Sequence, residues 1–475
     1  MLELSSLRKN KINLADYNSA QDIDNRIILS DFSPFDLEVL EEILFSPLKI
    51  SLKKMARNLD VQEQQLLPIL GKLSKAGLLS LADDSIVVDK EMRKYFEFQI
   101  QRFDPAFKPD LEFLQGLLRK VPIHVLPTWY SIPRSSNNIF ESILEKHILT
   151  PQIFQRYLTD LNFQDPTVQG IIKDLFSAPD LRISSSDLIS KYNLSRKDFE
   201  EIMLLLEFSF ISSIRYVKED DHWLEIVTPL YEWQQYLQFL KDTESPVIDP
   251  PDLIQRARES DFAFVEDMSA VLLHLQKQPE PFDNSLSPAL ISFLASQCKI
   301  SLKTEKDLRF AKTYLTHLIE KLCLIRLAGK SNGHLYALDT AHDWFDLSLE
   351  NRALYLYRHP LNRILNPSLP GELELERNIR EAEKSIKRVL HGKWVFFDDF
   401  IKGVIVSFTE DSAIMLKKVG KHWKYALPCY REAEIALIKA TVFEWLFEAG
   451  IVAIGLAENR ECFCVTSFGR FFFED

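Results

Sequence analysis

The most regular feature of the sequence is a pair of apolar stripes with helical spacing near its start. Between residues 52 and 73, apolar positions recur every three or four residues, as in amphipathic helices. The two stripes consist of Leu52, Met55, Ala56 and Leu59, and of Leu66, Ile69, Leu70 and Leu73. Gly77 follows as a helix stop, and Leu78–Leu79 and Ile86–Val88 have the apolar character of short strands. The pattern predicts two helices followed by a hairpin.

The same pattern recurs later in the chain, which indicates an internal repeat. Residues 44–51 read LFSPLKIS, and residues 175–184 read LFSAPDLRIS. Beyond these segments the two copies align without a gap, and every matched position that we compared is apolar. The matched positions are Ile50, Met55, Val61, Leu66, Ile69, Leu73 and Leu78 in the first copy, and Ile183, Leu188, Leu194, Phe199, Ile202, Leu206 and Ile211 in the second.

Helix, turn, helix and hairpin is the element order of a winged helix, and residues 35–89 resemble that family. Residues 36–45 would form its first helix. Weaker copies occur in residues 288–340 and 394–467, the last with residues 405–431 inserted between its two helices. The helices expected in these two copies are 288–297, 305–322, 398–404 and 432–449. We therefore expect a mostly α chain with short β-hairpins, built as a tandem array of about four winged-helix domains.

The domain boundaries follow from the copies and from one Pro-rich connector, TESPVIDPPD at residues 243–252. This connector is the expected main division, and each half is expected to fold alone. The expected segments are an N-terminal arm with the first winged helix (1–99), a helical connector (100–164), the second winged helix (165–242), the linker (243–252), the third winged helix (253–350), and the fourth with its insertion (351–475).

Composition narrows the class of protein further. Only 13 of 475 residues are Gly, which disfavours the glycine-rich loops that cradle phosphates and dinucleotides. The net charge is −12, so no global basic field attracts nucleic acid or anionic lipid. The five Cys offer no disulfide framework, and no signal peptide or run of 18 apolar residues is present. We expect a cytoplasmic protein with no membrane contact.

No set of residues in the sequence predicts catalysis. Gly329-Lys330-Ser331 resembles part of a P-loop, but the position of its first glycine is Leu324, so a hairpin tip is the better interpretation. Cys462 and Cys464 could form a metal or redox pair, although two small core residues are the simpler explanation. We expect no enzyme activity, no cofactor and no metal. A hydrolase with scattered catalytic residues remains the third alternative.

Local clusters of basic residues point to nucleic acid in the C-terminal half. Residues 299–330 are rich in Lys and Arg, and several of these residues follow helical spacing on the third helix of the third copy. That helix is the one that a winged helix places in the major groove. A second cluster lies in the insertion of the fourth copy. The candidate nucleic-acid-binding residues are Lys303, Lys306, Arg309, Lys312, Thr313, Lys330, Lys417, Lys418 and Lys421. A solvated charged face is the alternative interpretation.

The corresponding helices of the other copies carry acidic residues instead. These residues include Glu63 in the first copy, Asp198, Glu200 and Glu201 in the second, and Glu432, Glu434 and Glu444 in the fourth. Carboxylates at these positions would repel phosphates unless a neighbouring cation compensates. These modules, and the acidic N-terminal half as a whole, are therefore expected to contact a protein partner or to act as spacers.

Two short segments, LYALDTAHDWF (335–345) and FCVTSFGRFFF (463–473), resemble bacterial tandem winged-helix proteins, including the winged-helix regions that accompany XPB-like helicases. No helicase motif is present, so any motor would be a separate chain. The leading hypothesis is a non-enzymatic protein acting in transcription, replication or repair, with its C-terminal half on duplex DNA. The alternative is a scaffold or complex subunit whose winged helices bind only proteins.

Overall fold

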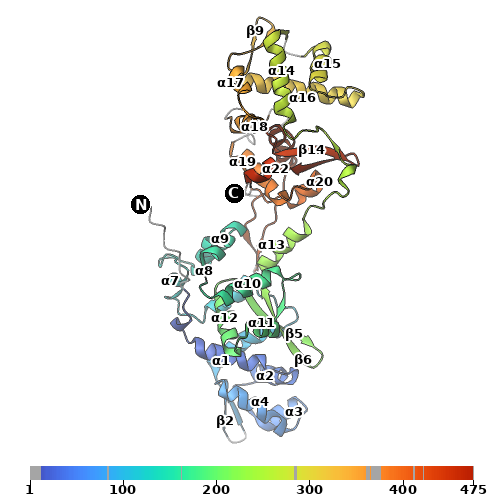
Figure 1. The fold of residues 1–475 in the computed structure, drawn as a ribbon. Coiled ribbons are helices and arrows are strands. Elements are labelled where there is room, and N and C mark those ends of the chain that lie inside the picture. The colour runs from blue at the N-terminus through green and yellow to red at the C-terminus, as the bar shows by residue number, and fades with distance from the viewer. Residues whose placement is uncertain are drawn as a thin grey trace. The chain divides into compact units, whose positions relative to one another are not determined.

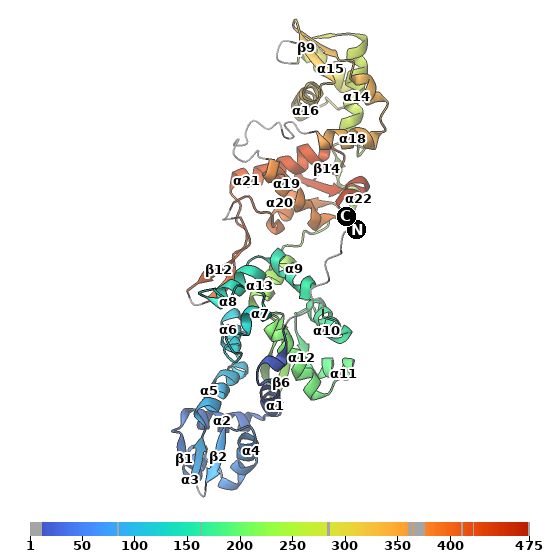
Figure 2. The same ribbon diagram turned by 90° about the vertical axis from the view of Figure 1, so that its left-hand side faces the viewer.

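The computed structural model of the chain divides into two compact units (Figures 1 and 2). It describes residues 12–82, 85–161, 163–282, 286–359, 364, 376–409, 412–420 and 422–473. The first unit comprises Met1–Gln238 and Met415–Ala426, and the second comprises Phe239–Ile414 and Leu427–Asp475. Both units are mostly helical with short antiparallel hairpins, which confirms the expected class of secondary structure.

One element order occurs four times in the described residues: a helix, a short strand, two helices and a hairpin. In the first unit, the first repeat is α2 (Pro34–Phe45), β1 (Lys49–Ser51), α3 (Leu52–Asn58), α4 (Glu63–Lys75), β2 (Leu79–Ala82) and β3 (Ser85–Val88). The second repeat is α10 (Pro166–Ser177), β4 (Ile183–Ser184), α11 (Ser185–Tyr192), α12 (Arg196–Phe208), β5 (Ser212–Glu219) and β6 (His222–Pro229). Their sheets have the matching orders β1-β3-β2 and β4-β6-β5.

The second unit contains the other two repeats. The third repeat is α14 (Ala263–Lys277), β8 (Glu280–Pro281), α15 (Pro288–Gln297), α16 (Glu305–Leu324), β9 (Ala328–Ser331) and β10 (His334–Ala337). The fourth repeat is α19 (Glu376–Lys384), β11 (Val395–Phe396), α20 (Phe397–Phe400), α21 (Glu432–Ala440) with the π-helix η6 (Thr441–Leu446), β14 (Val452–Ala457) and β15 (Arg460–Val465). The sheet orders are β8-β10-β9 and β11-β15-β14-β7, in which β7 is the strand Gln255–Arg256.

Further helices precede, connect and follow the repeats. In the first unit they are η1 (Leu14–Asp16), α1 (Ser19–Ser30), α5 (Lys90–Gln99), η2 (Ile100–Phe103), α6 (Leu111–Leu118), α7 (Leu126–Trp129), α8 (Ile139–His147) and α9 (Pro151–Leu161). In the second unit they are η3 (Pro251–Leu253), α17 (Ala341–Phe345), α18 (Leu349–Arg358), η4 (Ser385–Val389), η5 (Ile401–Gly403) and α22 (Ser467–Phe473). None of the described helices combines the length and the apolar character needed to cross a bilayer.

The apolar positions that define the sequence repeat form the repeat cores. In the first repeat, Ile50, Met55, Leu66, Ile69, Leu73 and Leu78 are all at most 4% exposed. In the second repeat, Leu188, Phe199, Leu206 and Ile211 are equally buried. The other matched positions are half-buried: Val61 in the first repeat, and Ile183, Leu194 and Ile202 in the second. In the second unit, one continuous hydrophobic cluster extends from Phe264 to Val465 and so joins the third and fourth repeats.

The division between the units differs from the expected linker at residues 243–252. It falls after Gln238, inside α13 (Tyr231–Asp242). The expected linker belongs to the second unit, where Val247 forms a β-bridge with Val395 and the Ile248 N–H donates to the Trp394 carbonyl at 2.9 Å. Backbone pairing with β11 therefore holds this proline-rich segment against the fourth repeat. Next to it, β7 (Gln255–Arg256) pairs with β14.

The insertion of the fourth repeat contains a hairpin that belongs to the first unit. This hairpin is formed by β12 (Leu416–Val419) and β13 (His422–Tyr425). The Leu416 N–H donates to the Leu149 carbonyl, and the Tyr425 hydroxyl donates to the Ile148 carbonyl, both at 2.7 Å. The two halves of the sequence are therefore not the two compact units, because the chain passes from one unit to the other three times.

Candidate nucleic-acid interface

Helix α16 carries most of the basic residues predicted to contact nucleic acid. It begins with a capping box, in which the Thr304 hydroxyl accepts from the Asp307 N–H and the Asp307 carboxylate accepts from the Thr304 N–H, both at 3.1 Å. Ala311, Leu315, Leu318, Ile319 and Leu322 are at most 1% exposed and fix the inward face of the helix. The opposite face is consequently turned to solvent.

The solvent face of α16 presents Arg309, Lys312 and Thr313, all exposed, as the helical spacing predicts. Lys303 is exposed in the turn that precedes the helix. Lys330 is exposed on β9, where its ammonium group lies 4.3 Å from the centre of the Phe282 ring. Among the described residues, none of these four cations forms an ion pair. Their side chains are therefore available to bind anionic groups.

Two lysines of the same segment differ from this picture. Lys306 lies in α16, but its side chain is outside the described part of the structure. Lys321, which adds to the positive charge of residues 299–330, is only 3% exposed, and its ammonium group lies 3.1 Å from the Glu448 carboxylate. This ion pair is buried on both sides, so Lys321 contributes no surface charge.

The second predicted cluster is on the β12–β13 hairpin and belongs to a different compact unit from α16. Lys417 and Lys418 are exposed, and Lys421 lies outside the described residues. Lys417 is directly opposite Lys424 in the strand register, which places two like charges side by side. Such a pair is unfavourable unless an anion binds to it or solvent screens it. The Lys418 ammonium group lies 5.7 Å from the centre of the Trp423 ring.

Acidic residues of the first unit flank this hairpin. His422 Nδ1 lies 3.3 Å from Glu112 and 3.8 Å from Asp110, which also caps α6. These three groups could hold a metal ion by distance alone. His422 and Glu112 are, however, at least half exposed, and the lysines of the hairpin oppose a second cation. We therefore interpret Asp110 and Glu112 as acidic groups that offset part of the basic charge of the hairpin.

The helices equivalent to α16 in the first and fourth repeats lack an exposed, unpaired basic face. On α4, the first turns carry Gln64 and Gln65, Lys72 lies 3.6 Å from Asp36, and Lys75 is a single exposed lysine in the last turn. On α21, Lys439 lies 2.5 Å from Glu461, and Glu434 is buried in the capping interaction at Arg431. Glu444 on η6 is half-buried, and burial raises its pKa to about 7. The surfaces of these helices therefore agree with their sequences, which contain no basic cluster.

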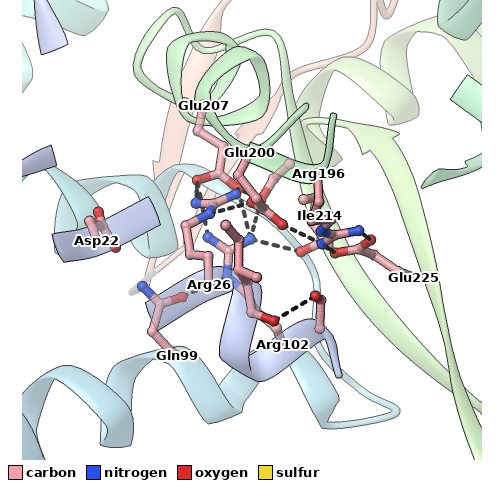
Figure 3. Close-up of polar contacts among 12 residues, drawn as sticks. Asp22, Arg26, Gln99, Arg102, Arg196, Glu200, Glu207, Ile214 and Glu225 are labelled. Atoms are coloured by element: carbon pink, nitrogen blue, oxygen red, sulfur yellow. Dashed lines mark hydrogen bonds and ion pairs between the residues drawn. The ribbon is translucent and has the colours of Figure 1, made fainter. Parts of the chain in front are cut away.

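The equivalent helix of the second repeat, α12, is covered along one face by α1 (Figure 3). Arg26 of α1 contacts two acidic residues of α12: its Nε lies 2.8 Å from Glu200, and its Nη1 lies 2.7 Å from Glu207. All three side chains are at most 4% exposed. Glu200, expected to repel phosphates from the surface, is therefore neutralised in the interior.

Further basic residues complete this buried network. Arg102 of η2 contacts both carboxylate oxygens of Glu207, at 2.7 and 3.0 Å, and donates to the Ile214 carbonyl. Arg196 bridges Glu200 and Glu225. Burial disfavours ionisation of Glu207, but Arg102 and Arg26 outweigh this effect and hold its pKa well below the ordinary value. The network therefore holds α1, η2 and α12 together, and we call it a structural lock in this sense.

The other residues that the sequence offered as candidates for chemistry lie in the strands of two hairpins. Gly329, Lys330 and Ser331 lie in β9 at a hairpin, in agreement with a hairpin tip. Cys462 is fully buried in β15 and Cys464 is half-buried. Burial raises the pKa of each thiol to about 11, which opposes the thiolate form that a metal or redox site needs.

A comparison of the sequence with protein-family models and with curated proteins gives no match. The candidate interface therefore stands on its own geometry. Helical spacing was sufficient to locate Arg309, Lys312 and Thr313. It did not reveal the pairing of Lys321 or the buried network, because the partners are far apart in the chain. The one local signal was that Glu200 and Glu207 share a helix face with the apolar residues Met203 and Leu204.

Proposed function

We propose that the chain is a non-enzymatic tandem winged-helix protein that binds duplex DNA through the third repeat. In this proposal the four repeats are winged helices, and α16 is the recognition helix. The observation that carries the proposal is the set of exposed, unpaired cations on α16 and β9. Arg309 and Lys312 lie on the solvent face of α16, Lys303 is exposed in the turn before the helix, and Lys330 is exposed on β9. The other three equivalent helices lack such a set among their described residues.

The chemistry of these side chains fits phosphate contacts. Arg and Lys bind phosphate oxygens through charge-assisted hydrogen bonds, and contacts to the backbone account for most of the affinity of sequence-independent binding. In a winged helix, the third helix enters the major groove and the hairpin reaches an adjacent groove or backbone. The positions of Arg309 on α16 and Lys330 on β9 correspond to these two contacts.

The test is a charge reversal on the exposed face. Arg309→Glu combined with Lys312→Glu should abolish detectable binding of fluorescent duplex DNA in anisotropy titrations at about 50 mM salt, where the electrostatic attraction is strong. Both side chains are exposed and unpaired, so we expect the fold to be unchanged by circular dichroism.

The matched control is Lys54→Glu combined with Arg57→Glu, on the exposed face of α3. This variant changes the net charge by the same amount in a repeat with no proposed DNA contact. The DNA affinity should then fall by less than about threefold, as a long-range charge effect alone would give. Equal loss of affinity in the two variants would contradict the assignment of α16.

The second candidate function is a scaffold whose winged helices bind only proteins. The observation that favours it is the exposure of Leu308 (48%) and Phe310 (41%) on α16. Exposed apolar residues beside basic ones suit a protein interface as well as a DNA groove. If the wild-type chain does not bind nucleic acid at low salt, the scaffold function replaces the proposed one.

A further inference from the structure

A groove runs along the exposed face of α12, the helix of the second repeat that is equivalent to α16. Its volume is about 830 Å³. Four of its lining residues on α12 are spaced as one helix face: Asp198, Glu201, Ile202 and Leu205. The opposite side is formed by the N-terminal segment around Leu14, by residues 163–165 and by Val168 of α10.

The groove differs from the α1-covered face of the same helix. Glu200 and Glu207 point into the buried network, whereas Asp198 and Glu201 are exposed. The floor is apolar, because Leu194, Ile202 and Leu205 are only half-buried there. The matching position of Ile202 in the first repeat, Ile69, is 1% exposed. Apolar surface that is buried in one repeat is thus left open in the other.

The charge of the groove has a single sign. Asp165, Asp198 and Glu201 line it, and no Lys, Arg or His is among its described lining residues. None of the three carboxylates forms an ion pair with any described cation. The Asp198 carboxylate accepts from the Ser195 hydroxyl at 2.6 Å, which leaves its negative charge uncompensated.

We propose that this groove is a docking site for a basic amphipathic segment of a protein partner. Lysine or arginine side chains of the segment would pair with Asp165, Asp198 and Glu201. Leucine-like side chains would cover Ile202 and Leu205. The groove excludes nucleic acid as occupant, since its carboxylates repel phosphates. An apolar floor with a charged rim is the usual design for a bound amphipathic helix.

The site gives a location to the protein contact expected of the acidic half, and it does not depend on DNA binding by the third repeat. Its test contains no nucleic acid, so the two proposals can fail separately. The probe is a short fluorescent peptide with Leu and Lys at amphipathic helical spacing. The reference probe has Glu in place of every Lys.

The full-length chain should bind the Lys peptide in anisotropy titrations and should not bind the Glu peptide. Asp198→Lys combined with Glu201→Lys should weaken binding of the Lys peptide about tenfold, because two attractive contacts become repulsive. Glu201→Lys alone should give a smaller loss in the same direction. This single change keeps the Asp198 contact at the start of α12.

The matched control is Glu38→Lys combined with Glu41→Lys. These two exposed residues have the same spacing on α2, away from the groove. The control should change the affinity for the Lys peptide by less than about twofold. Equal weakening by both double variants would show attraction to net negative charge only and would overturn the proposal. Unchanged binding in the groove variants would overturn it as well.

Discussion

Individual charged residues have two roles in this molecule, and sequence alone does not separate them. Lys312 and Arg309 are exposed and unpaired, whereas Lys321 and Arg26 are buried and paired. Exposed charges contribute little to stability and are free to bind partners. Buried charges contribute little net stability as a pair, but they are costly to leave without a partner. The exposed cations are therefore the candidates for binding a partner, whereas the buried cations stabilise the packing of the helices.

The buried network predicts a large effect of removing one arginine. Arg26→Met should destabilise the first unit by about 3 kcal/mol, because Glu200 and Glu207 each lose a counter-charge in the interior. Hydrogen exchange of the α12 amides, under conditions where exchange requires unfolding of the unit, measures this change. Lys94→Met, at the exposed pair with Glu91, is the control and should change stability by less than about 0.5 kcal/mol. Equal effects of the two changes would show that the network is not a structural lock.

Glu232 on α13 predicts a dependence of stability on pH. It is 2% exposed, and one of its carboxylate oxygens accepts from the Leu111 N–H at 3.0 Å. Burial raises its pKa from 4.5 to about 8. The folded state therefore holds a proton that the unfolded chain releases above pH 4.5. The stabilisation that comes from this protonated carboxyl group is fully present below pH 4.5 and is lost as the pH rises through about 8.

Glu232→Gln removes the ionisation and keeps a carbonyl oxygen as acceptor. The free energy of unfolding of this variant, relative to that of the wild type, should be about 3 kcal/mol more favourable to folding at pH 8 than at pH 5. Urea unfolding followed by circular dichroism at the two pH values measures this change. Glu91→Gln, on an exposed side chain, should show the same stability difference from wild type at both pH values. A constant difference for Glu232→Gln as well would contradict the raised pKa.

At the scale of elements, the sequence pattern predicts the helices, which depend on contacts between residues close together in the chain. The helices 288–297 and 432–449 are expected from the weaker copies of the repeat, and the structure has α15 at Pro288–Gln297 and α21 with η6 at Glu432–Leu446. The position of the β12–β13 hairpin was not predictable, because its partners at Ile148 and Leu149 are distant in sequence. Pairing of this kind leaves no periodic signal.

Removal of the hairpin should reduce the protection of nearby amides in the first unit against hydrogen exchange. In a full-length chain whose residues 415–426 are replaced by a Gly-Ser linker, the amides of α8 and α9 should exchange faster than in the wild type. The reason is that the Ile148 and Leu149 carbonyls lose their donors and the buried Leu416 and Tyr425 no longer cover them. The amides of α3 and α4 are the internal control and should be unchanged. Unchanged exchange in α8 and α9 would show that the hairpin does not stabilise this unit.

At the scale of the whole molecule, a net charge of −12 coexists with a local basic surface. The net charge opposes long-range attraction to DNA, so the proposed binding would depend on the few cations of the third repeat. Helical spacing in the sequence predicts the part of the candidate site that Arg309 and Lys312 form. The acidic groove on α12 was not predictable, because it requires the N-terminal segment and α10 to lie beside α12.

The most direct test of the central proposal is the salt dependence of duplex DNA binding by the wild-type chain. Lys303, Arg309, Lys312 and Lys330 offer four phosphate contacts, each of which lowers the slope of log K against log salt by about 0.9. We expect binding at about 50 mM salt with a slope near −3.6 when all four contacts form. Absence of binding to duplex DNA at this salt concentration would contradict the account, and a slope near zero would show that these cations do not contact phosphates.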